Sequence, residues 1–136
     1  MINLPTLKRQ HKEIGEMLGD LKQSIGRDNV AQEASDIARK ISLLAGKLKV
    51  HLNTEDQYMY PQLLQSEHLE LKNIARTYID EMGYISEAFM EYKDRFNTKM
   101  KISGNLPGFM KETREIIEIL EERIAKEDAS LYTVLE

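Results

Sequence analysis

Apolar side chains recur at alternating steps of three and four residues along almost the whole chain. This spacing places them on one face of an α-helix, because the helix completes a turn about every 3.6 residues. No segment shows the strict alternation of apolar and polar residues that is typical of a half-buried strand. The sequence therefore predicts an all-α protein whose helices each carry one inner stripe. The first stripe comprises Leu4, Leu7, His11, Ile14, Leu18, Leu21 and Ile25.

Prolines at positions 5, 61 and 107 coincide with breaks in this spacing and divide the chain into four helical segments. A turn at residues 26–29 ends the first helix, and Asn29 is the predicted N-cap of the second. Ser66 is the predicted cap of the third helix, and residues 97–108 are predicted to form the longest loop. The other stripes are Ile37, Ile41, Leu44, Leu48, His51, Glu55 and Tyr58 in the second helix; Leu71, Ala75, Tyr78, Met82, Ile85, Phe89, Tyr92 and Phe96 in the third; and Phe109, Thr113, Ile116, Leu120, Arg123, Glu127 and Leu131 in the fourth.

Each amphipathic helix must bury its stripe against the others, and short connections make neighbouring helices antiparallel. We therefore expect an up-down-up-down antiparallel four-helix bundle. A chain of 136 residues encloses one core, so residues 1–136 are expected to form a single domain. A weak internal repeat indicates a duplicated helical hairpin: at an offset of 72 residues, Glu55 aligns with Glu127 and Tyr60 with Tyr132.

Composition excludes several classes of function. The chain has no Cys, so only His, Asp, Glu and Tyr are available to bind a metal, and thiolate chemistry is absent. The net charge is −4 and the two signs are interspersed, which disfavours a nucleic-acid role. The N-terminus lacks a basic and apolar leader, and no apolar run approaches the roughly 18 residues of a membrane span. We expect a cytoplasmic protein without a membrane partner.

Ionisable residues interrupt three of the four stripes: His11 in the first, His51 and Glu55 in the second, and Arg123 and Glu127 in the fourth. Counting about 1.5 Å per residue from the shared end of the bundle puts all of them at one height. His51 and Glu55 are four residues apart and share a helix face, so an imidazole and a carboxylate can reach one cation. A metal site and a metal-free, hydrogen-bonded polar cluster both fit this pattern.

The motifs around these residues resemble those of the hemerythrin, or HHE cation-binding, family. The resemblance rests on LKRQHKEI at 7–14, HLNTEDQYMYP at 51–61 and IAKEDASLY at 124–132, and it extends over nearly the whole chain. Its most distinctive part is the His-x3-Glu pair followed by an aromatic-Pro pair. The resemblance implies a four-helix bundle that holds two non-haem irons, bridged by carboxylates and otherwise bound mostly by His. Members of the family carry or sense oxygen, nitric oxide or iron.

The departures from the family pattern imply that half of the site is lost. A complete family site uses more His than the three present here. Carried over by position, four residues stand where one iron and its bridging carboxylates would be: His11, His51, Glu55 and Glu127. Ligands of the other iron would fall at Tyr78, Met82 and Arg123, which are poorly suited to it. We therefore expect at most one non-haem metal ion per chain, with iron the first candidate and zinc or manganese the alternatives.

Several neighbouring residues have weaker claims to the site. Asp128 is an alternative ligand in place of Glu127. Tyr78 and Met82 lie in an unbroken apolar stripe and are expected to be core residues, although a tyrosine can bind ferric iron. Glu81 is expected to be exposed, and His68 is expected at the surface without a role.

Arg123 is the one cationic side chain assigned to the polar layer. We expect its guanidinium to take the place of the missing cation and to neutralise Glu55 and Glu127, since arginine stays protonated and binds carboxylates with a planar fork. The alternative is that Arg123 lies at the edge of the stripe and reaches water, with Ile124 taking the inward place.

The leading hypothesis is a non-catalytic, hemerythrin-like module that binds one metal ion in a sensor or storage role. The alternative is a metal-free scaffold or regulatory interaction module derived from such a domain. A ferritin-like oxidase is disfavoured because no His follows a Glu by three residues. The inner stripes offer no base–nucleophile pair, so we expect no enzyme activity. Nothing in the sequence indicates a partner protein.

Overall fold

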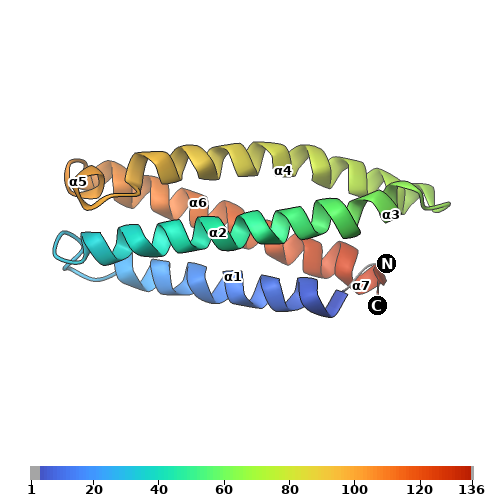
Figure 1. Cartoon of the computed structure of the whole chain (residues 1–136), viewed down its shortest axis with the longest axis horizontal. Coiled ribbons are helices and arrows are strands. Elements are labelled where there is room, and N and C mark those ends of the chain that lie inside the picture. Colours follow the sequence, from blue (N-terminus) through green and yellow to red (C-terminus); the bar gives the residue numbers. More distant parts are fainter. Residues whose placement is uncertain (1–3, 136) are drawn as a thin grey trace.

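The computed structural model describes residues 4–135, and this part of the chain contains helices and no strand. The long helices are α1 (Leu4–Ile25), α2 (Ala34–Tyr58), α4 (Leu69–Phe96) and α6 (Leu106–Lys126). They pack side by side, with α1 against α2 and α6, and α4 against α2 and α6 (Figure 1). Shorter segments link or extend them: α3 (Tyr60–Leu64), α5 (Lys99–Ser103), the π-helix η1 (Glu127–Tyr132) and α7 (Thr133–Leu135). The all-α prediction is confirmed.

Two predicted helix caps are wrong. α2 begins only after Glu33, and Asn29 instead bonds that residue: its carbonyl accepts from the Glu33 N–H at 3.1 Å and its side-chain amide donates to the Glu33 carboxylate at 3.2 Å. α4 begins after His68, whose N–H donates to the Ser66 hydroxyl at 3.1 Å. Both polar side chains stabilise the turn before the helix, because short polar side chains bond nearby backbone in turns as readily as at caps.

Residues 97–108 form more helix than predicted. The Thr98 hydroxyl accepts from the Lys101 N–H at 3.2 Å and starts α5, which buries Ile102 completely. The Asn105 side chain accepts from the Gly108 N–H at 3.2 Å and starts α6, with Pro107 in its first turn. The glycines and proline that suggested a loop are compatible with helix starts, where proline needs no hydrogen-bond partner.

The second stripe also ends differently from the prediction. Tyr58 is 53% exposed, whereas Met59 and Tyr60 are buried. α2 stops at Tyr58 and the chain resumes as α3 at Tyr60, with Pro61 in its first turn, and the inward tyrosine at this end is Tyr60.

The core consists of two apolar clusters with the ionisable residues between them. One cluster fills most of the bundle and includes Ile14, Leu48 and Leu120. The other, at the end near the termini, includes Leu7, Met59 and Leu131. His11 lies between Leu7 and Ile14 along α1. In the same way, the ionisable residues of α2 lie between Leu48 and Met59, and those of α6 and η1 lie between Leu120 and Leu131. The polar layer is therefore enclosed by apolar side chains on both sides.

Candidate metal centre

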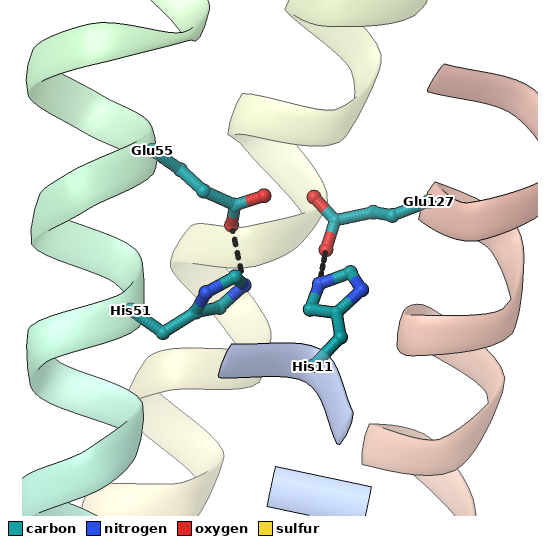
Figure 2. A group of neighbouring side chains, drawn as sticks. All are labelled: His11, His51, Glu55 and Glu127. Carbon is teal, nitrogen blue, oxygen red and sulfur yellow. Dashed lines mark hydrogen bonds and ion pairs between the residues drawn. The ribbon is translucent and has the colours of Figure 1, made fainter. Parts of the chain in front are cut away.

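Four side chains from three separate segments meet in the polar layer: His11 from α1, His51 and Glu55 from α2, and Glu127 from η1 (Figure 2). One donor atom of each lies within 4.8 Å of the others. None of the four residues is more than 3% exposed. The structure thus brings together all four residues that the sequence singled out.

The four residues form two imidazole–carboxylate pairs. The His51 Nε2 atom lies 3.2 Å from the Glu55 Oε1 atom, and the His11 Nε2 atom lies 3.2 Å from the Glu127 Oε1 atom. Figure 2 shows the two carboxylates extending toward each other from opposite helices. Two nitrogen and two oxygen donors consequently converge on one small volume.

Residues outside the cluster orient both imidazoles. The His11 Nδ1–H donates to the Asp128 carboxylate at 2.8 Å, and the His51 Nδ1–H donates to the Gln10 side-chain carbonyl at 2.8 Å. Each bond holds the ring with its Nε2 atom facing inward, which is how outer residues commonly fix metal-binding histidines. Asp128, considered from sequence as a ligand, lies behind His11 and is half exposed.

Two buried tyrosines bind the outer oxygens of the carboxylates. The Tyr60 hydroxyl donates to the Glu127 Oε2 atom at 2.9 Å, and the Tyr132 hydroxyl donates to the Glu55 Oε2 atom at 2.9 Å. Neither tyrosine was predicted from the sequence to belong to the site. Their alignment with each other in the internal repeat was the available signal.

The donor set fits a bound cation. Among the described residues, the buried His51 Nε2 and Glu55 Oε1 atoms face each other at 3.2 Å and make no hydrogen bond. Buried polar atoms are rarely left unpaired, because each loses its bonds to water on burial. A cation between them would satisfy both, and imidazole with carboxylate suits divalent first-row metals.

Burial and neighbouring charges separate the pKa values of the four groups. Burial, reinforced by the charge of His11, lowers the pKa of His51 to about 4. Burial also opposes the charged form of His11, but Glu127 and Asp128 outweigh it and raise the pKa of His11 above 6.5. Burial and the charge of Glu127 raise the pKa of Glu55 well above its ordinary value. Burial also tends to raise the pKa of Glu127, but its hydrogen bond with His11 and the charge of Arg123 outweigh burial and hold this pKa below its ordinary value.

These shifts predict how the metal-free protein titrates. We expect His51 to stay neutral until the pH falls to about 4, whereas His11 keeps its proton above pH 6.5. Folding lowers the pKa of His51, so the stability that this residue contributes is complete above pH 6.5 and is lost as the pH falls toward 4. A proton NMR titration measures both values, with His11→Gln and His51→Gln assigning the signals. Two imidazoles titrating together near pH 6.5 would contradict the arrangement.

The family model for the hemerythrin HHE cation-binding domain matches residues 3–135. The chain belongs to the hemerythrin HHE cation-binding family. No curated protein gives a significant match to this chain. No solved structure gives one either. Within the described part of this hemerythrin-family chain, no helix is long and apolar enough to cross a membrane.

In this hemerythrin domain, Arg123 is fully buried in the polar layer, at 3% exposure. Its Nη2 group donates to the Tyr60 hydroxyl at 3.0 Å and to the Tyr78 carbonyl at 2.8 Å. Its Nε atom lies 3.8 Å from the Glu127 Oε1 atom. The alternative in which Arg123 reaches water is therefore wrong, and Ile124 is only half buried.

The surroundings of Arg123 correct two further expectations. Glu81 is only partly exposed: its side chain is 40% exposed, and one carboxylate oxygen lies 3.2 Å from Arg123 Nη1. The carboxylate partners of Arg123 are therefore Glu127 and Glu81. The expected pairing of Arg123 with Glu55 is absent among these contacts, and Glu55 accepts a hydrogen bond from Tyr132 instead. Tyr78 is buried as predicted, with the guanidinium 4.4 Å above the centre of its ring.

A surface pocket of about 390 Å³ adjoins the cluster on the side of α1. Its lining includes Lys8, Lys12 and Asp128, together with His11 and Tyr132. The last two side chains also bond members of the cluster, and both are almost fully buried. They consequently form the wall between the cluster and solvent on this side.

Proposed function

We propose that this hemerythrin-family domain binds one non-haem metal ion per chain through His11, His51, Glu55 and Glu127, without catalysing a reaction. The observation that carries the proposal is the buried convergence of two imidazole nitrogens and two carboxylate oxygens, two of which have no other partner. Iron is the first candidate, with zinc and manganese as alternatives, because this donor set suits all three. The four long helices would serve as an up-down-up-down bundle that presents these donors in one layer.

A single ion is proposed because Arg123 stands where the repeat places the counterpart of His51. The buried guanidinium brings a fixed positive charge next to Glu127, and a second cation there would be repelled. Tyr78 packs under that guanidinium, and Met82 offers a thioether, which is a poor ligand for these metals. The second half of a dinuclear site is thus occupied by protein.

The bound ion would supply Lewis acidity and, if iron, a redox-active centre. The chain's own residues hold the ligands in place and exclude water from them. Such a site suits a sensor or a store of the ion, in which occupancy itself is the output.

Metal analysis after anaerobic purification tests the proposal. Fe(II), Mn(II) and Zn(II) are offered separately, and bound metal is measured against protein concentration. We expect a ratio near one ion per chain for at least one metal. A ratio near two would contradict the loss of the second site. A ratio near zero for all three would favour the second candidate, a metal-free scaffold, which the hydrogen bonds of Tyr60, Tyr132 and Arg123 within the layer support.

The proposed single ion also predicts the response to oxygen. The coloured oxygen complex of dinuclear hemerythrins draws electrons from two irons, and one iron is proposed here. We therefore expect no reversible charge-transfer band in the near-ultraviolet and visible spectrum when the Fe(II) protein meets oxygen. The appearance of such a band, reversed by removing oxygen, would show that two irons are present.

A further inference from the structure

The two tyrosines of the polar layer cross between the halves of the internal repeat. Tyr60 follows Glu55 by five residues, and Tyr132 follows Glu127 by five residues. Yet each hydroxyl donates to the carboxylate of the opposite half, at 2.9 Å in both cases. Both side chains are buried, at 3% and 1% exposure. The same contact is therefore made twice, in repeat-related positions.

A change in the backbone makes each contact possible. In an α-helix, a residue five positions later points about 140° away, because each residue turns the helix by about 100°. From Glu127 to Tyr132 the chain is a π-helix, whose wider turn returns the fifth residue to the same face. In the other half the break at Met59, with φ −112° and ψ −60°, precedes Tyr60. Two different irregularities thus bring a tyrosine into the layer.

The tyrosine bonds determine which oxygen of each glutamate faces the histidines. In Glu55 and in Glu127, the Oε2 atom accepts the tyrosine proton, whereas the Oε1 atom faces a histidine Nε2 atom at 3.2 Å. Each carboxylate is therefore turned with Oε2 toward a phenol and Oε1 toward an imidazole, and it can bind a cation with both oxygens only if both face the ion. We propose that Tyr60 and Tyr132 are positioning residues of the metal site, each holding one oxygen of a glutamate away from the ion so that the other alone ligates. This inference rests on the proposed function.

The two tyrosines differ in what holds them. The Tyr60 oxygen accepts from the Arg123 Nη2 group at 3.0 Å, which directs the phenol proton toward Glu127. The Tyr132 oxygen lies 3.1 Å from the His11 Nε2 atom instead. Removing the Tyr60 hydroxyl also deprives Arg123 of a partner, and removing the Tyr132 hydroxyl also takes a contact from His11, so an effect shared by Tyr132→Phe and Tyr60→Phe is the one that reports on the glutamates.

Cobalt(II) loaded into the full chain provides a readout of ligand number. Four-coordinate cobalt absorbs visible light several-fold more strongly than five- or six-coordinate cobalt. Two imidazoles and two single-oxygen carboxylates make four ligands, so we expect intense visible bands in the parent protein. In Tyr132→Phe and Tyr60→Phe the freed oxygen also binds, and the intensity should fall several-fold at unchanged stoichiometry. Tyr92→Phe is the matched control, because this buried hydroxyl bonds Thr113, outside the polar layer.

The outcomes distinguish failure of the tyrosine role from failure of metal binding. Cobalt bound at one ion per chain with equal spectra in the parent and both variants would overturn the role of the tyrosines and leave metal binding intact. Weak bands in the parent protein would overturn it as well. A parent protein that takes up no cobalt, iron, zinc or manganese would overturn the proposed function and this inference together. Circular dichroism of each variant establishes that the helices are retained.

Discussion

Replacing Arg123 with methionine is expected to lower the free energy of unfolding by on the order of 3 to 5 kcal/mol, the usual cost of removing one partner of a buried ion pair. The guanidinium is buried and meets Glu127, Glu81 and the Tyr60 hydroxyl. Methionine preserves much of the volume but removes the guanidinium charge beside Glu127. The Tyr78 carbonyl also loses its donor.

Chemical denaturation of the metal-free variant and parent measures this loss from the midpoint and slope of unfolding. Arg39→Met is the matched control, because Arg39 is exposed and pairs with Asp36 on its own helix, so its loss should have no measurable effect. A loss below roughly 1 kcal/mol for Arg123→Met, the range of surface ion pairs, would show that the guanidinium does not neutralise the layer.

Saturation with the bound metal is expected to stabilise the protein by about 4 kcal/mol when the free metal is about a thousand times its dissociation constant. For a domain of this size, the melting temperature should rise on the order of 10 °C. The physical reason is that the ligands converge only in the folded chain, so the ion binds the native state. The His51 Nε2 and Glu55 Oε1 atoms, which contact each other but make no hydrogen bond, would both bind the ion at the same time.

His51→Ala should abolish this gain, measured as the difference in melting temperature with and without metal. Taking that difference separates metal binding from any loss of stability in the variant itself. His68→Ala is the control, since His68 is exposed at the start of α4 and should leave the gain unchanged. An equal gain in the His51→Ala variant would place the ion elsewhere.

Helical periodicity sufficed to predict the cluster, because a constant rise per residue converts sequence position into height. His11, His51, Glu55 and Glu127 were found by that argument, and the structure brings their donor atoms together. This conversion of sequence position into height assumes an unbroken helix, and the predicted position is wrong where the backbone departs from one. Beyond Glu55 and Glu127 the break and the π-helix shift the inward position, so Tyr60 and Tyr132 were left without a role.

Contacts outside the stripes could not be predicted from periodicity either. Gln10 is the sequence neighbour of His11, and Asp128 is the sequence neighbour of Glu127. Each bonds an imidazole through its side chain, and the spacing of the stripes does not specify these bonds. Glu81 was expected to be exposed because it borders the stripe of its helix. The buried charge of Arg123 attracts its carboxylate, and this depends on a residue from a different helix.

The polar layer between the two apolar clusters also fixes how far each helix extends along its neighbours. In a bundle with purely apolar stripes, a helix can slide by one turn, about 5.4 Å, and replace one leucine contact with another. Here the same slide would separate Glu55 from Tyr132 and His11 from Glu127, leaving charges buried against leucine and isoleucine. Unpaired buried charges cost several kcal/mol each, so only one longitudinal alignment is stable. The layer that contains the proposed ligands therefore fixes the longitudinal alignment of the helices as the bundle assembles, whether or not an ion is present.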